Sequence, residues 1–343
     1  PRNMHESYCE LVLPFASSPE LLEQYINASG GIRTGMLMEH LDSLAGSIAY
    51  RHVLGPTFDS LSKKQGIYIV TASVDRLDML APLYPVRDMR LSGQVIHTGR
   101  SSMEIAVRME ALEKDGSEET IMVGRFFMVC RDARTHKAAP VNPLSIETPE
   151  DQMLFNIGEA HKTKRQTRAS AALTLVPPTS REAEALHTLF LTYGQQEDPE
   201  YASPDGMQRV WMGDTRLEKC LMMFPQERNG TQPRLYPAGY LMRLAYELGF
   251  ANSVLYTGGH VLFLSLDGIA FAKPVPIGSI LRLTSHVLHT SSTEQFPGLI
   301  HVGVQANVVD VATGREETTN DFRFTWCVDG GKPLARRVVP KTY

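Results

Sequence analysis

The sequence predicts an α+β protein of two similar domains, each with one long central helix wrapped by a curved antiparallel sheet. The glycine-led segment that starts at Gly35 returns 204 positions later at Gly239. Strand-like segments follow both copies, and Asp75 matches Asp267 at an offset of 192. Since the repeat is far longer than about 50 residues, it indicates a duplicated domain rather than a solenoid of short units.

The first long helix is predicted over Thr34–Tyr50. Gly30 and Gly31 interrupt the chain before it, and its second half is almost entirely apolar or small. A helix that is apolar on nearly every face must be buried, so strands have to wrap it. An entry arm up to Pro19 and a short helix over Glu20–Tyr25 precede it.

Strands are predicted where β-branched, aromatic and methionine residues alternate partly with polar ones. The hairpin signal Asp115-Gly116 separates the last two strands of the first half. The predicted strands of the first half are Ile67–Val74, Arg90–Thr98, Ser102–Leu112 and Thr120–Cys130. The second half repeats the scheme with a helix over Ala238–Tyr256 and strands near Val261–Phe271, Ser279–Thr290, Leu299–Val309 and Thr318–Val328.

We place the entry arm and first domain at residues 1–150, a helical connection at 151–205 and the second domain at 206–343. The connection is too long for a bare linker, so we expect ordered helices near Glu150–Lys164 and Arg181–Tyr193 to pack beside the sheets. Each central helix is only half enclosed by its own strands. We therefore expect the domains to pack sheet to sheet as an intrachain pseudo-dimer, with the two helices antiparallel across a pseudo-twofold axis.

Composition and charge exclude several classes of protein. The net charge of -4 gives no electrostatic case for nucleic-acid binding, and the basic segment His161–Arg168 is expected to be a solvated face of a helix or linker. No apolar run reaches the length of about 18 residues that a membrane-spanning helix needs.

The four cysteines form no Cys-x-x-Cys pair, which fits free thiols in a reducing compartment. Because the sequence begins at Pro1 rather than Met, we expect a leader segment to be missing from it.

Asp42 is the strongest candidate for chemistry. It is the sole carboxylate between Leu41 and Tyr50, in a helix that is expected to be buried. A buried carboxylate must be paired, hydrogen-bonded or placed in a cavity where its shifted pKa is used. The alternative is an acid at the exposed edge of the helix's first turns, where the helix dipole favours it.

Other candidates lie in a loop and at the helix starts. Asn229 stands in a polar loop, although Asn-Gly is also a common turn. Gly35 and Gly239 allow the backbone to approach a ligand closely, and the helix N-termini can bind an anion or a developing oxyanion.

The sequence contains no Gly-x-Ser-x-Gly, Walker-type, Gly-x-Gly-x-x-Gly or His-Glu-x-x-His motif, and His97 and His289 are expected to be sheet histidines. No metal is therefore predicted.

Several of these segments resemble one enzyme family. Gly35–Asp42, Thr71–Asp75 and Gly99–Ile105 resemble the helix, second strand and third-strand entry of double-hotdog acyl-CoA thioesterases. The whole chain, including Pro225–Asn229 and Leu241–Glu247, resembles the mitochondrial acyl-CoA thioesterase 9 and 10 type. The resemblance implies two hotdog domains and hydrolysis of a fatty acyl-CoA thioester to free fatty acid and CoA. It also implies that acyl-CoA is the substrate, that no cofactor is used, and that the protein acts in the mitochondrial matrix.

The resemblance also implies the residues of the site. Asp42 would activate water as a general base or attack directly, and Asn229 of the other domain would orient water or substrate. The helix N-terminus near Gly239 would hold the thioester oxygen, with Gly35 and Glu247 in the same oxyanion and substrate-binding region.

Two further residue groups follow from the resemblance. Arg100, Ser101 and Ser102 end one strand and start the next, where they would bind the CoA phosphates; a plain β-turn is the alternative. Tyr246 stands at the position of a second acid. One asymmetric active site per chain is therefore expected.

The segment before the second helix departs from the family pattern. Ala238 replaces a glycine, Pro237 replaces an aromatic residue, and the spacing to Asn229 is longer. A second hypothesis is therefore a thioesterase-like structural subunit of a mitochondrial assembly with little or no catalytic activity. We expect a homotrimer for a free enzyme, and membership of a larger mitochondrial complex for a structural subunit.

Overall fold

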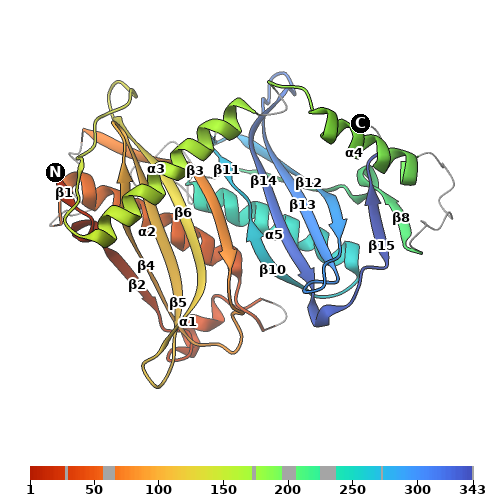
Figure 1. The fold of residues 1–343 in the computed structure, drawn as a ribbon, viewed down its shortest axis with the longest axis horizontal. Coiled ribbons are helices and arrows are strands. Elements are labelled where there is room, and N and C mark those ends of the chain that lie inside the picture. Colours follow the sequence, from red (N-terminus) through yellow and green to blue (C-terminus); the bar gives the residue numbers. More distant parts are fainter. Residues whose placement is uncertain are drawn as a thin grey trace.

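The computed structural model describes residues 1–27, 30–56, 66–171, 175–194, 206–224, 237–271 and 273–341. Figure 1 shows two domains side by side, each with a long helix, α2 or α5, against one face of an antiparallel sheet. This is the predicted α+β arrangement of two hotdog domains in one chain. Within the described ranges, no helix is long and apolar enough to cross a membrane.

The first domain contains the four long strands that its sequence predicts. Its elements are β1 (Arg2–Asn3), a 3-10 turn (His5–Ser7), β2 (Cys9–Leu13), α1 (Pro19–Glu23), α2 (Thr34–Leu54), β3 (Ile67–Met79), β4 (Asp88–Thr98), β5 (Ser102–Leu112), β6 (Glu118–Asp132) and β7 (Leu144–Ser145). The predicted entry arm contains a strand of the sheet, because β2 pairs with β4 and forms an edge of the sheet.

The second domain repeats this order. Its elements are β8 (Gln208–Trp211), a 3-10 turn (Met212–Thr215), β9 (Leu217–Met222), α5 (Ala238–Thr257), β10 (Val261–Leu266), β11 (Ile269–Ala270), β12 (Ile280–Ser291), β13 (Leu299–Val309), β14 (Glu316–Val328), a 3-10 turn (Asp329–Gly331) and β15 (Arg336–Val339). The strand predicted over Val261–Phe271 is interrupted after Leu266, so it forms the separate strands β10 and β11.

Burial of α2 follows from its composition. Leu37, Leu41, Ala45 and Ile48 are all buried, as expected for a helix that is apolar on most faces. The helix ends before Gly55, whose φ of 104° is a conformation that few other residues adopt. The helix therefore lies enclosed between its own sheet and the second domain.

The sheets of the two domains join edge to edge. β3 of the first domain pairs antiparallel with β10, where Leu77 is opposite Leu266 and Asp78 is opposite Ser265. Across the described residues the strand order is β2-β4-β5-β6-β3-β10-β14-β13-β12-β9, and β11 also pairs with β3. The expected sheet-to-sheet packing thus takes the form of one continuous sheet.

The helices α2 and α5 contact each other in antiparallel orientation. A Cβ at Gly239 would lie 2.9 Å from the Cα of Glu39, and a Cβ at Gly35 would lie 3.5 Å from the Cα of Arg243. The start of each helix therefore packs against the following turns of the other helix. This contact confirms the intrachain pseudo-dimer.

Two helices of the connection lie between the domains in sequence. α3 (Pro149–Ser170) starts with a capping box in which Thr148 and Asp151 exchange hydrogen bonds, and it crosses the outer face of the first-domain sheet (Figure 1). α4 (Ser180–Leu189) continues into a π turn over Phe190–Gly194 and has no buried residue among those described. The expectation that the helices pack beside the sheets is therefore confirmed for α3 and wrong for α4.

Candidate active site

Asp42 lies on the third turn of α2, at the contact with α5. Its side chain is 6% exposed. Among the described residues, it accepts a hydrogen bond from the Thr71 hydroxyl, 2.7 Å from Oδ1, and one from the Gly239 backbone N–H, 2.8 Å from Oδ2. The alternative of an acid at an exposed helix edge is therefore wrong. The carboxylate joins α2, β3 and the helix of the opposite domain.

Burial raises the pKa of Asp42 to about 6, because the ionised carboxylate loses its hydration. The hydrogen bonds from Thr71 and Gly239 favour the ionised form and lower the pKa, whereas the charge of Glu39 raises it. A carboxyl group with a pKa near 6 is mostly ionised at neutral pH and still accepts a proton readily. These are the properties of a general base.

The N-terminus of α5 can contact Asp42 because its first residues neither cap the helix with a side chain nor, at Gly239, carry a Cβ. Pro237, the N-cap, makes no side-chain hydrogen bond to the helix, and Gly239 has no Cβ. A Cβ at Gly239 would lie 2.8 Å from the Cβ of Asp42. Asp42 therefore takes the part of a capping residue for the helix of the other domain, and the helix dipole favours its negative charge.

Gly35 and Glu247 lie at the same helix interface. Gly35 packs against Arg243 and Tyr246. The Glu247 carboxylate forms ion pairs with Arg33 at 2.5 Å and with Arg243 at 3.3 Å. This geometry favours a helix-positioning role for Glu247, since an ionised carboxylate accepts hydrogen bonds and cannot donate one to an oxyanion. Its part in substrate binding stays a prediction.

The segment Arg100–Ser102 forms the turn between β4 and β5. The Arg100 carbonyl accepts a hydrogen bond from the Val141 N–H. The residue after Val141 is Asn142, whose carbonyl is hydrogen-bonded to His52 on α2. His52 is ten residues beyond Asp42, which is about 15 Å along the helix axis. The structure therefore places this turn toward the far end of α2 and does not bring it to Asp42. CoA binding by this turn stays a prediction.

The loop that contains Asn229 lies outside the described residues, which resume at Pro237. The role of Asn229 therefore stays a prediction. The two substitutions that follow it are described: Pro237 is the N-cap of α5, and Ala238 is the first residue of the helix. Both are compatible with the bond between Gly239 and Asp42.

Thr71 is a site residue that sequence reasoning did not single out. It lies within the strand segment that resembles the thioesterases, but a threonine in a strand is common and gives no signal of its own. Alternation along β3 could have placed it on the face toward α2. Its distance to Asp42 depends on how the helix lies across the sheet.

Tyr246 occupies the matching position on α5. It is buried, and burial raises the pKa of its hydroxyl. Its ring lies within 6.3 Å, centroid to centroid, of four aromatic rings: Phe250, Phe263, Phe324 and Trp326. The second half of the interface is therefore an aromatic cluster, and the single asymmetric site stays a prediction.

Comparisons with known proteins identify the family. No protein-family model matches the chain. Acyl-coenzyme A thioesterase 9, mitochondrial, of Mus musculus is 35% identical over 348 residues, which cover 100% of this chain and 75% of the mouse protein. Mouse acyl-coenzyme A thioesterase 10, mitochondrial, is 34% identical with the same coverage. This chain belongs to the acyl-CoA thioesterase 9 and 10 family.

Solved structures agree with the fold of this family. An acyl-ACP thioesterase from Bacteroides thetaiotaomicron aligns with a TM-score of 0.51 over 93% of this chain and 98% of its own. Its sequence identity is 11%, so the likeness concerns the fold alone. Because the alignment covers almost the whole chain, it supports the arrangement of two hotdog domains.

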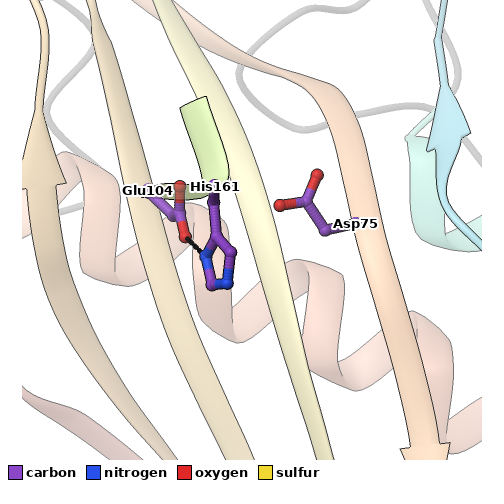
Figure 2. A group of neighbouring side chains, drawn as sticks. All are labelled: Asp75, Glu104 and His161. Atoms are coloured by element: carbon purple, nitrogen blue, oxygen red, sulfur yellow. Dashed lines mark hydrogen bonds and ion pairs between the residues drawn. The ribbon is translucent and has the colours of Figure 1, made fainter. Parts of the chain in front are cut away.

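A second group of ionisable side chains in this family member lies on the outer face of the sheet. Figure 2 shows Asp75 on β3, Glu104 on β5 and His161 on α3, whose ligand atoms all lie within 4.8 Å of one another. Arg165 pairs with Asp75 at 2.7 Å and with the fully buried Glu104 at 3.0 Å. The guanidinium thus supplies the positive charge that a metal ion would bring.

This cluster corrects one prediction. The basic segment His161–Arg168 was expected to be solvated, but His161 and Arg165 both bond to Glu104. Since a buried carboxylate must be paired, these two side chains fasten α3 to the sheet. The pairing favours attachment of the connection over metal binding.

Proposed function

We propose that this protein hydrolyses fatty acyl-CoA thioesters to free fatty acid and CoA. The observation that supports this most directly is the buried Asp42, held between the Thr71 hydroxyl and the N-terminus of α5. It occurs in a chain that belongs to the acyl-CoA thioesterase 9 and 10 family. Because its groups come from both domains, the site forms when the domains pack together.

Asp42 is the general base in this mechanism. Above a pH of about 6 its carboxylate is mostly ionised and takes a proton from the attacking water, whose oxygen adds to the thioester carbonyl. The tetrahedral intermediate then expels the CoA thiolate, which takes up a proton. Direct attack by Asp42 is the alternative: it displaces the CoA thiolate and forms a mixed anhydride, which water hydrolyses to the fatty acid and free Asp42. Thr71 fixes the orientation of the carboxylate in both cases.

The N-terminus of α5 is the place for the thioester oxygen. The first N–H groups of a helix lack acceptors within the helix, and the dipole makes this end positive. The Gly239 N–H holds Asp42, while the positive helix end stabilises the oxyanion. Gly35 and Gly239 permit the close approach of the helices, and Glu247 helps to hold them through Arg243.

Residues away from Asp42 complete the proposal. Asn229 orients water or the acyl group from the second domain. Arg100, Ser101 and Ser102 bind the CoA phosphates from the turn near the far end of α2. Such a separation suits CoA, because its pantetheine arm places the phosphates far from the thioester.

The setting of the enzyme follows from the same proposal. Acyl-CoA is the substrate, and hydrolysis requires no cofactor. Two relatives are named as mitochondrial, and we propose a mitochondrial location for this protein, in the matrix. We also propose domains at residues 1–150 and 206–343, a connection at 151–205, and a homotrimer of such chains. A chain that served as a structural subunit would join a larger mitochondrial complex instead.

Thioester hydrolysis by the purified protein tests the proposal. CoA release is followed with a thiol reagent over a series of acyl chain lengths, with Asp42→Asn as the matched control. A blank without substrate is subtracted, because Cys220 is a free and exposed thiol. Saturable hydrolysis that disappears in the variant supports the proposal. Absence of hydrolysis at every chain length would contradict it and favour the structural subunit.

A further inference from the structure

Glu39 and Arg243 occupy matching positions in the two domains. The offset of 204 that joins Gly35 to Gly239 also joins Glu39 to Arg243. In antiparallel helices related by a twofold axis, matching residues that contact each other lie at the axis. The contact here is an ion pair, with Arg243 Nη1 3.2 Å from Glu39 Oε2. The two domains therefore meet at their pseudo-twofold axis through opposite charges.

Arg243 lies across α2 beside the groups that hold Asp42. A Cβ at Gly35 would lie 3.2 Å from the Cγ of Arg243, so the stem of the arginine packs on that glycine. Its guanidinium reaches Glu39, one turn further along α2. The Cα of Glu39 in turn lies 2.9 Å from the Cβ that Gly239 lacks. The ion pair therefore flanks the backbone contact that places the Gly239 N–H on Asp42.

Further ion pairs extend from Arg243 along the interface. Glu247 lies 3.3 Å from Arg243 Nε, 2.5 Å from Arg33 Nη2 and 4.0 Å from Lys219 Nζ. The Glu39, Arg243 and Glu247 side chains are 24% to 33% exposed. Because these charges are partly buried, solvent screens them less than it screens a fully exposed pair. Arg243 thus connects a carboxylate of α2 to one of α5.

We propose that Arg243 is a positioning residue for hydrolysis at Asp42, because its bridge between Glu39 and Glu247 holds the N-terminus of α5 where Gly239 bonds to the carboxylate. The inference rests on the proposed function. Arg243 acts through Gly239 and Asp42 rather than on the substrate. A merely structural ion pair would stabilise the fold and leave the kinetics and titration of Asp42 unchanged.

Arg243 also neutralises Glu39, whose charge raises the pKa of Asp42. Among the described residues, the charged groups at this helix contact are Glu39 on the same helix and Arg243 on α5, while Thr71 and Gly239 are neutral donors. The titratable His40 lies beside Glu39 and Arg243 and is hydrogen-bonded to the Tyr25 hydroxyl. The two ion pairs that Glu247 forms with Arg33 and with Lys219 lie beyond Arg243. Removal of Arg243 leaves the charge of Glu39 uncompensated, which raises the pKa of Asp42. Removal of the Glu39 charge lowers it.

Kinetics of Arg243→Met test the inference. We expect kcat to fall roughly tenfold with KM within about twofold, because the base is misaligned while substrate binding is retained. The midpoint of the pH profile of kcat/KM should rise by about half a unit. Arg243→Lys should recover part of both effects. The control Arg282→Met breaks an ion pair with Glu316 between β12 and β14 and should change neither quantity.

Glu39→Gln and the double variant provide a second check. Glu39→Gln should lower the midpoint, and the double variant should return toward the wild-type midpoint because both charges are absent. Carbon-13 NMR of aspartate-labelled protein measures the Asp42 titration without turnover, and Asp42→Asn identifies its resonance. If Arg243→Met fails to fold, Arg243→Lys and the kcat of Glu39→Gln decide, because Glu39→Gln breaks the same ion pair while its midpoint also moves through the charge of Glu39 alone.

The outcomes separate this inference from the proposed function. An active enzyme whose kcat and midpoint are the same in wild type, Arg243→Met and Glu39→Gln overturns the inference. A wild type that hydrolyses no acyl-CoA, while the NMR midpoint moves as expected, overturns the proposed function and retains the electrostatic link between Arg243 and Asp42.

Discussion

In the first domain, the position that faces the leading glycine of the partner helix contains Asp42; in the second domain it contains Tyr246. Asp42 accepts a hydrogen bond from the Thr71 hydroxyl. The residue that matches Thr71 at the offset of 192 is Phe263, whose ring lies 5.3 Å from that of Tyr246. A hydroxyl and a carboxylate on one side are thus replaced by two aromatic rings on the other.

The second half-site is filled by its side chains. Trp326, which matches Met128 at an offset of 198, is fully buried. Gly249, which matches Ala45, provides room for it, because a Cβ there would lie 2.7 Å from the ring. Large buried rings stabilise the interface, whereas ionisation of the buried Asp42 costs roughly 3 kcal/mol at neutral pH. One copy of the duplicated site retains a titratable group at a cost in stability, and the other contributes packing.

Asp42→Asn should produce the largest loss of activity. We expect kcat to fall by at least about 100-fold, because a positioned base contributes roughly 10² to 10⁴. The fold should remain intact, and urea unfolding at pH 7 should show a gain of up to roughly 3 kcal/mol because a buried charge is removed. Retention of more than half of the wild-type activity would show that Asp42 is not the base.

The pH dependence of stability tests whether the gain in Asp42→Asn comes from removal of the buried charge. The folded-state pKa of Asp42 is raised, so the folded protein binds the proton more tightly than the unfolded chain does. Stability from this group is present below about pH 4 and is lost as the pH rises through about 6. The gain in Asp42→Asn should therefore disappear at pH 4. A gain that is equal at pH 4 and pH 7 would have another cause.

Alanine at the two leading glycines should distinguish the half-sites. At Gly239 the new Cβ would lie 2.8 Å from the Cβ of Asp42 and 2.9 Å from the Cα of Glu39, so the helices must separate and kcat should fall roughly tenfold or more. At Gly35 the nearest atom would be Arg243 Cγ at 3.2 Å, which has to move by only a few tenths of an ångström while the guanidinium keeps its ion pairs, so the loss should be less than about threefold. Steady-state kinetics and thermal unfolding of both variants measure the difference. Equal losses would contradict the asymmetry.

The pH profile should distinguish Thr71 from Phe263. kcat/KM should rise through an apparent pKa of about 6 and then level, since the ionised form of Asp42 is the base. Thr71→Val removes a donor that lowers this pKa, so the profile should move to higher pH and the rate at pH 7 should fall roughly threefold. Phe263→Leu should leave the midpoint unchanged. A wild-type profile in Thr71→Val would contradict the role of its hydroxyl.

The elements of the fold could be predicted from the sequence because their signals are local. An apolar helix and alternating strand segments predicted α2, α5 and the long strands that surround them. The edge strands β2 and β9 gave weaker signals, since they have five and six residues and several exposed positions. The composition of α2 predicted a buried helix and made Asp42 the strongest candidate, but it left open an exposed position for that residue at the helix edge.

The partners of Asp42 could not be predicted in the same way. Its bond to Gly239 spans 197 positions and depends on how the two domains dock. Its bond to Thr71 depends on which residue of β3 faces the helix. The burial of Glu104 similarly depends on α3 crossing the outer face of the sheet. Such contacts join residues far apart in sequence, so periodicity does not reveal them.

Tyr246→Phe should have the smallest effect, and it is the matched control for Asp42→Asn. Burial raises the pKa of the Tyr246 hydroxyl, so the group stays neutral at physiological pH and cannot serve as a base. Its ring makes the contacts with Phe263 and Trp326, and phenylalanine retains them.

We expect Tyr246→Phe to keep kcat within about twofold of the wild type and to lose about 1 kcal/mol of stability through the buried hydroxyl. Steady-state kinetics and urea unfolding of the same preparation measure both quantities. A tenfold loss of kcat at unchanged stability would mean that the Tyr246 hydroxyl takes part in hydrolysis. The aromatic half-site would then belong to the active site, and the division of the duplicated interface into a titratable half and a packing half would be wrong.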